Sequence, residues 1–131
     1  MTKENLRLLD ANLNRLREGI RVVEDIYRYI FNDKIIATKL KNLRHSSRIE
    51  IYDDLLKSRD IQNDVLKTST KSEQNRTDLT SILIANYKRA QESARVLEEF
   101  TKLIDANISE NFKSIRYDLY HLEKSILTNK Q

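Results

Sequence analysis

The chain has 131 residues, and 24 Lys and Arg against 20 Asp and Glu give it a formal net charge of +4 at pH 7. It has no cysteine, no proline and one glycine, which excludes disulfides, thiolate zinc sites and the Gly-rich phosphate loops of P-loop and Rossmann proteins. Its 39% hydrophobic share suffices for the core of one domain, and no apolar run is long enough to span a bilayer. We therefore expect one cytoplasmic helical domain over residues 1–131, with no membrane partner. The mild charge suits an anionic small molecule, and we expect no nucleic-acid ligand.

The first part of the chain predicts two helices. Apolar residues recur every three or four positions over about residues 4–31, and Thr2 precedes them as a suitable N-cap. Asn32 and Asp33 interrupt this pattern, and Asp33 is a suitable cap for a second helix over about residues 34–57. The short link between the helices implies that they are antiparallel neighbours.

A polar segment, residues 58–77, follows, and its weak periodicity and length are typical of a functional loop or a disordered connection. Two further helices are predicted over about residues 78–105 and 107–128. The scarcity of glycine and proline favours this all-α fold over β-hairpins. The prediction is thus four long helices in two antiparallel hairpins, residues 4–57 and 78–129, joined by a long polar loop.

The two predicted hairpins share a polar motif. "ANLNRLREGIRVVED" spans residues 11–25 and "ANYKRAQESARVLEE" spans residues 85–99, with the common skeleton A-N-x-x-R-x-x-E-x-x-R-V-x-E-[D/E]. The core positions differ more, since Leu16 aligns with Ala90. A repeat kept for structure alone would more naturally retain its core. The repeat therefore predicts an internal duplication with approximate two-fold symmetry, and it draws attention to its polar residues.

Four charged residues of the motif, Arg15, Glu18, Arg89 and Glu92, fall within a second apolar stripe on each helix. A helix that is apolar on two sides is usually buried on both, and buried charges must be paired or must bind a ligand. Each arginine also lies three residues before its glutamate, so solvated salt bridges are an equal alternative. Arg21, on another side of the helix, is expected to be a surface residue.

Other polar residues give weaker signals. Asn is a mediocre helix former, so Asn12 and Asn86 at equivalent mid-helix positions suggest a specific hydrogen bond. In the loop, Asp60 and Asp64 lie four residues apart beside Arg59, a pattern that can hold Mg²⁺ and a phosphate. On spacing alone, a solvated linker explains the loop more simply.

The stretches "ANYKRAQESARVLEEF", "RHSSRIEIYDDLLKSRD" and "RYDLYHLE" resemble the alternative, all-helical hydroxymethylpyrimidine-phosphate kinase family. That domain is often fused N-terminal to thiamine-phosphate synthase, and the resemblance runs from about Leu8 to Leu127. The chain departs from the family pattern in the loop, where Asn63 and Leu66 stand in place of glycines. The resemblance carries over these site candidates: Asn12, Arg15, Glu18, Arg44, His45, Arg59, Asp60, Asp64, Arg76, Asn86, Arg89 and Glu92.

The resemblance implies phosphorylation of hydroxymethylpyrimidine phosphate to its pyrophosphate with ATP and Mg²⁺, in thiamin biosynthesis. It also implies a functional link to thiamine-phosphate synthase. In the resulting prediction Arg15 and Arg89 clamp phosphates, while the glutamates of the motif orient them or help to coordinate Mg²⁺. The asparagines of the motif read polar edges of the pyrimidine or of ATP. Asp60 and Asp64 are the catalytic, Mg²⁺-binding carboxylates, and the 58–77 loop is a lid that excludes water.

Two alternatives stay open at this point. One is a helical enzyme that binds a dicarboxylate through the paired arginines, without ATP. The other is a non-enzymatic interaction or phosphotransfer protein, in which His45 accepts a phosphoryl group or the second stripe binds a partner. If kinase turnover is absent, the second stripe is expected to be a homodimer interface.

Overall fold

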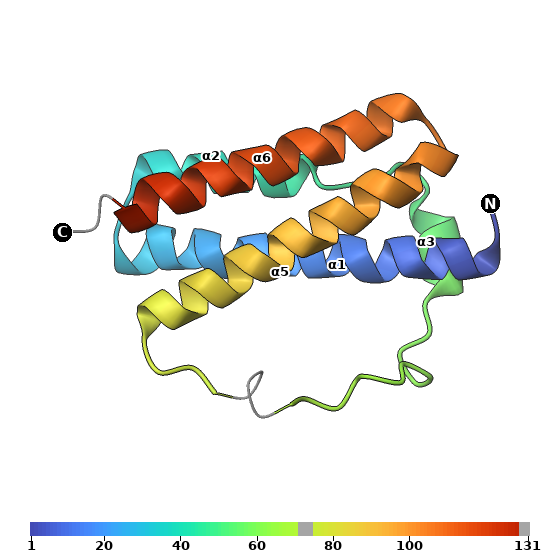
Figure 1. Ribbon diagram of the computed structural model, residues 1–131, viewed down its shortest axis with the longest axis horizontal. Helices are drawn as coiled ribbons and strands as arrows, with labels where there is room; N and C mark the ends of the chain where they lie inside the picture. The colour runs from blue at the N-terminus through green and yellow to red at the C-terminus, as the bar shows by residue number, and fades with distance from the viewer. Residues whose placement is uncertain (71–74, 129–131) are drawn as a thin grey trace.

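The computed structural model describes residues 1–70 and 75–128, and the regular structure within these ranges is entirely helical (Figure 1). The α-helices are α1 (Lys3–Asp25), α2 (Lys34–Ser46), α3 (Tyr52–Ser58), α5 (Leu79–Phe100) and α6 (Ala106–Thr128). A π-helical turn, η1 (Ile26–Ile30), extends α1, and a 3-10 turn, η2 (Thr101–Leu103), extends α5. The all-α prediction is confirmed, and residues 71–74 of the predicted loop lie outside the described residues.

Local caps set the starts of the helices. The Oγ1 atom of Thr2 accepts a hydrogen bond from the backbone N–H of Asn5 at 3.1 Å, as the sequence predicted. The predicted cap of α2 is also confirmed, because Asp33 Oδ1 accepts from the backbone N–H of Ile36 at 3.0 Å. Asp78 caps α5 in a reciprocal capping box with Ser81. Each cap satisfies an N–H that has no partner within its helix.

The prediction of one helix over residues 34–57 is wrong, because the chain bends between α2 and α3. Ser47 lies at the end of α2, and its hydroxyl donates to the carbonyl of Leu43 at 2.7 Å. Beyond it, the backbone N–H of Arg48 bonds to the carbonyl of Ser46 at 3.0 Å. Serine hydroxyls compete in this way with the helical backbone ladder. The bend also buries Ile49 in the core, so tertiary packing overrides the helical pattern.

The helices α1 and α5 form the centre of the bundle and pack against each other more extensively than any other pair. They run antiparallel and cross at an angle, with α2 and α6 together on one side of them (Figure 1). Gly19 lies at the crossing, where a Cβ atom would be 3.2 Å from the carbonyl oxygen of Asn86 and 3.4 Å from Cβ of Ala90. The missing side chain of Gly19 therefore allows the close approach of the two backbones.

Two tyrosine hydroxyls are buried in the core without a hydrogen-bond partner in the described part of the chain. They belong to Tyr27, on η1, and Tyr87, on α5, whose exposed fractions are 4% and 0%. Burial raises the pKa of Tyr27 to about 12, with a smaller contribution from the negative charge of Asp33. Burial also raises the pKa of Tyr87 well above its ordinary value. An unsatisfied buried hydroxyl costs free energy, so we expect these two groups to lower the stability of the fold.

Replacing Tyr87 with phenylalanine is expected to raise the free energy of unfolding by about 1 kcal/mol at pH 7, because it removes an unsatisfied polar atom. The wild-type chain is also expected to lose stability as pH rises from about 10 to 12. A folded-state pKa above the unfolded-state value gives a contribution that is complete at lower pH and is lost as the phenolate forms. Urea denaturation at a series of pH values measures both effects.

The Tyr27→Phe, Tyr87→Phe double variant is expected to lose less stability over this pH range than the wild type. Tyr52, which is 61% exposed, provides the control, and Tyr52→Phe should change neither quantity. A marked loss of stability in Tyr87→Phe at pH 7 would show that its hydroxyl has a partner in solution.

Candidate functional site

The four charged motif residues that the sequence placed in a second apolar stripe, Arg15, Glu18, Arg89 and Glu92, are all exposed. The expectation that this stripe is buried is wrong at these positions. Within the described residues none of the four forms an ion pair or a hydrogen bond, so the predicted i,i+3 salt bridges are absent as well. Val22, on the same stripe, is 39% exposed. We call these four residues the α1–α5 charged face.

The remaining acidic residues of the motif have a structural role. Glu24 is 1% exposed and accepts two hydrogen bonds from the guanidinium of Arg44, at 2.7 and 3.1 Å. Glu98 accepts two from Arg116, at 2.9 and 2.8 Å. The pairs join α1 to α2 and α5 to α6, and the hydrogen bonds to Glu24 are the main reason why the pKa of Arg44 is raised. Arg44 is therefore occupied by Glu24, and its substrate-binding role stays a prediction.

The asparagines of the motif make the same hydrogen bond in both hairpins. Nδ2 of Asn12 donates to the carbonyl of Leu8 at 2.9 Å, and Nδ2 of Asn86 donates to the carbonyl of Ile82 at 2.9 Å. The specific hydrogen bond that the sequence suggested is thus present, within the helix itself. Whether these asparagines also contact a ligand stays a prediction.

The second arginine of each motif makes an exposed i,i+4 ion pair. Arg21 contacts Asp25 at 3.2 Å, and Arg95 contacts Glu99 at 2.9 Å. Arg21 is a surface residue, as predicted. Equivalent residues therefore make equivalent contacts in both hairpins, which agrees with a duplication, although the superposition of the hairpins stays a prediction.

The charged face points away from the outer helices. Arg15 precedes Glu24 by nine residues, as Arg89 precedes Glu98, and at about 100° per residue this separation is about half a turn. Because the glutamates contact α2 and α6, the arginines lie on the opposite sides of α1 and α5. Figure 1 shows residues 59–70 and 75–78, which lie between α3 and α5, on that same side of the bundle. The structure thus places the charged face and the described part of the loop on one side.

The start of the loop is attached to α1. Arg59 donates two hydrogen bonds to the carboxylate of Asp10, at 2.8 and 2.9 Å, and Asp10 is 5% exposed. These bonds are the main reason why the pKa of Arg59 is raised. Arg7 also donates to the carbonyl of Asp60 at 3.1 Å. Sequence reasoning missed Asp10, which lies just before the repeated skeleton and whose partner is far away in the chain.

The two predicted metal ligands take part in local turns. Asp60 accepts hydrogen bonds from the side chain and the backbone of Asn63, at 2.8 and 3.0 Å, and these lower its pKa. Asp64 accepts from the backbone N–H of Leu66 at 3.0 Å. Among the residues that the structure describes, Asn32 is the one non-glycine residue with a positive φ, so Asn63 and Leu66 fit the loop without left-handed backbone.

A complete protein cage for Mg²⁺ is not formed, since no group of three or more His, Asp or Glu that could hold a metal occurs in the described ranges. Mg²⁺ is commonly held by one or two carboxylates together with water and substrate phosphates. That Asp60 and Asp64 form such a partial site stays a prediction, and it requires Asp60 to exchange its bonds to Asn63. The two other candidates are exposed: His45 near the end of α2, and Arg76 in the loop, which donates to the carbonyl of Asn75.

Comparison with known protein families shows to which family the chain belongs. The model of the ThiD2 family matches residues 7–125. The chain belongs to the ThiD2 family. Within the described ranges of this ThiD2-family chain, no helix is long and apolar enough to cross a membrane. No solved structure gave a significant match.

Curated relatives of this ThiD2-family chain are longer proteins. It is 42% identical over 125 residues to a thiamine-phosphate synthase of Synechocystis sp. PCC 6803, an alignment of 95% of the chain and 36% of the relative. It is 40% identical over 120 residues to the thiamine-phosphate synthase of Rhodopirellula baltica, with 88% and 32% covered. The chain thus spans about a third of the length of these relatives. Together the comparisons support a thiamin-biosynthesis context.

Proposed function

We propose that this chain phosphorylates hydroxymethylpyrimidine phosphate to its pyrophosphate, with ATP as the phosphoryl donor and Mg²⁺ as the metal. The observation that carries the proposal is the pair Arg15 and Arg89. They occupy equivalent positions of the repeat, on the same side of the two central helices, and no described residue pairs with either. Membership of the ThiD2 family supports the thiamin-biosynthesis context.

The reaction suits a site made of side chains. The γ-phosphoryl group forms a new P–O bond to the phosphate of the substrate while its bond to the β-phosphate of ATP breaks, so that ADP leaves. Such a transfer depends on positioning and on neutralisation of phosphate charge. The guanidinium group matches phosphate oxygens with two parallel hydrogen bonds. Arg15 and Arg89 are thus suited to hold the phosphates, and Glu18 and Glu92 are suited to orient them.

The loop supplies the remaining groups of the proposed site. Asp60 and Asp64 would hold Mg²⁺ together with phosphate oxygens, and the ion would add further neutralisation of phosphate charge. The bonds from Arg59 to Asp10 and from Arg7 to Asp60 fix the start of the loop beside α1. In this proposal residues 61–70, which follow these anchors, close over the charged face and exclude water from it.

A coupled assay with purified protein tests the proposal. Consumption of ATP is expected to require both hydroxymethylpyrimidine phosphate and Mg²⁺, and the unphosphorylated pyrimidine is assayed separately as an alternative acceptor. If ATP consumption does not depend on either pyrimidine, the proposed function is wrong. In that case, the oligomeric state measured by light scattering tests the homodimer alternative for the same face.

Closure of the loop is a separate prediction. Val65 and Leu66 are 94% and 81% exposed, which is unusual for apolar side chains and expected of a lid in its open state. Saturating ATP analogue, Mg²⁺ and hydroxymethylpyrimidine phosphate are expected to slow hydrogen exchange at least about tenfold in residues 60–70. Mass spectrometry of peptides from the loop and from α6 measures this, with α6 as the unchanged control. Exchange in the loop that does not respond to ligands contradicts a lid.

A further inference from the structure

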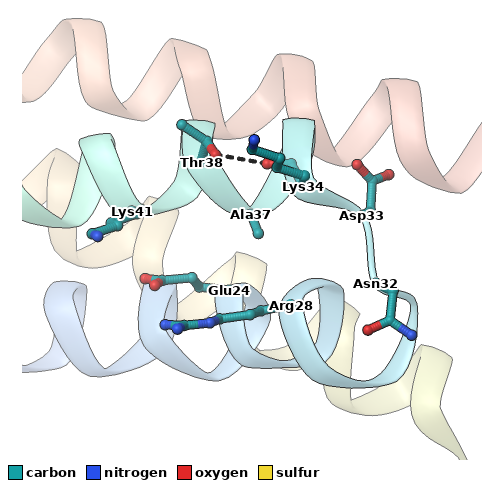
Figure 2. A pocket seen from close by; sticks show the side chains of 8 residues that line it. All are labelled: Glu24, Arg28, Asn32, Asp33, Lys34, Ala37, Thr38 and Lys41. Carbon is teal, nitrogen blue, oxygen red and sulfur yellow. Dashed lines mark hydrogen bonds between the residues drawn. The ribbon is translucent and has the colours of Figure 1, made fainter.

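A second feature lies on another side of α1, in the space between its C-terminal end and α2. A cavity of about 280 Å³ opens there, lined by residues of α1, η1 and α2 (Figure 2). Arg28 reaches into it from η1, beside Glu24, and Lys41 lies on the α2 side. Asn32, Asp33, Lys34 and Thr38 are the other polar residues of its lining. The cavity is separate from the charged face, because Glu24 lies about half a turn from Arg15 on α1.

The cavity has an excess of positive charge. Arg28, Lys34 and Lys41 make no ion pair within the described chain, although the guanidinium of Arg28 lies 4.9 Å from the ring centre of Tyr29. The carboxylate of Glu24 is already neutralised by Arg44 at 2.7 Å. The two carboxylates in the lining belong to Glu24 and Asp33. Because Glu24 is paired with Arg44, Asp33 alone is left to offset the three cations.

The backbone around the cavity is unusual. The π-helical turn η1 contributes Arg28 to the lining, and such turns often occur at functional sites. Asn32 lies in the lining with φ of 53°, the one positive φ of a non-glycine residue in the described part of the chain. Left-handed backbone is common for asparagine directly after the end of a helix, so this φ accompanies the turn that separates η1 from α2.

The second hairpin provides a comparison within the same molecule. At the position equivalent to Arg28 it has Lys102, which is paired with Glu99 at 3.1 Å. After the two-residue shift in its shorter link, Ala106 and Glu110 occupy the positions of Lys34 and Thr38. The second hairpin also has a 3-10 turn instead of a π-helical turn. The excess of positive charge is thus a property of the first hairpin, and the general architecture of a hairpin does not require it.

We propose that this cavity binds a small phosphate anion, either free phosphate or pyrophosphate or the phosphate group of a small organic ester. The planar guanidinium of Arg28 can donate two parallel hydrogen bonds to a phosphate group. The ammonium groups of Lys34 and Lys41 each add a localised positive charge. A volume of about 280 Å³ is at the lower end of small-molecule sites, which favours a phosphate or pyrophosphate group with at most one small ring attached. The site is independent of the charged face, so it goes beyond the proposed function.

The experiment is a titration of the full chain, labelled with ¹⁵N, by sodium phosphate, pyrophosphate and a simple phosphate monoester at constant ionic strength. Saturable shifts are expected for the backbone signals of residues 32–41. Arg28→Ala and Lys41→Ala are each expected to weaken binding about tenfold, because each removes a charge-assisted contact. Lys39→Ala, an exposed lysine of α2 that does not line the cavity, should leave binding unchanged.

The relative affinities of the three anions separate the free anions from an organic phosphate as the natural ligand. Arg89→Ala should retain the shifts, which distinguishes this site from the charged face whatever the outcome of the kinase assay. Shifts that stay linear and spread over all surface lysines would overturn the proposal. Equal affinity in the wild type, Arg28→Ala and Lys41→Ala would overturn it as well.

Discussion

Arg15→Ala and Arg89→Ala are each expected to lower kcat/KM for hydroxymethylpyrimidine phosphate about a hundredfold and to leave the melting temperature nearly unchanged. Both side chains are exposed and have no partner among the described residues, so their removal leaves no buried group unsatisfied. A phosphate contact that strengthens in the transition state is worth about 3 kcal/mol, which corresponds to this loss of rate.

The motif contains its own control for this experiment. Arg21 and Arg95 belong to the same repeat, and each makes an exposed ion pair on its own helix. Such pairs contribute about 0–1 kcal/mol to stability, so Arg21→Ala and Arg95→Ala should leave both kcat/KM and the melting temperature nearly unchanged. If Arg15→Ala and Arg89→Ala turn over substrate as fast as Arg21→Ala, the charged face is not the site and the loop must be tested next.

Glu24→Ala is expected to lower the free energy of unfolding by about 3–5 kcal/mol, the largest loss among the single substitutions considered for this protein. The carboxylate is 1% exposed and is held by Arg44, whose side chain is itself only 14% exposed. Removal of Glu24 therefore leaves a guanidinium largely shielded from water without its counter-ion. Glu98→Ala, at the equivalent pair with Arg116, should act in the same direction. Urea denaturation at pH 7 measures both.

A double substitution tests the physical reason. Exchange of a buried ion pair for apolar groups of similar volume is often neutral, because both desolvation costs disappear together. Glu24→Leu combined with Arg44→Met should therefore recover most of the stability that Glu24→Ala loses. Asp25→Ala, which removes the exposed partner of Arg21, is the control and should cost about 0–1 kcal/mol. A double variant as unstable as Glu24→Ala would show that the pair has a further structural role.

Those features of the fold that depend on neighbours in the sequence were predictable. The caps at Thr2 and Asp33 bond to N–H groups three residues away, so the beginnings of α1 and α2 follow from short stretches of sequence. The all-helical architecture follows equally from apolar spacing and from the scarcity of glycine and proline. The break at Ser47 was missed because residues 44–48 contain no glycine or proline that would indicate a helix end, and beyond it Ile49 is buried in the core.

The sequence by itself also showed which polar positions the two halves share, since the repeated skeleton contains Arg15, Glu24 and their counterparts. Only the tertiary structure decided which of these side chains have a hydrogen-bond partner among the described residues. Glu24 forms an ion pair with Arg44 on the neighbouring helix, and Asp10 forms one with Arg59, which is 49 positions away in the chain. Partners so distant in the sequence leave no local pattern, because the packing of α1 against its neighbours brings them together. For the same reason, helical periodicity identified two apolar sides of α1 and could not show that one of them is exposed at Arg15, Glu18 and Val22.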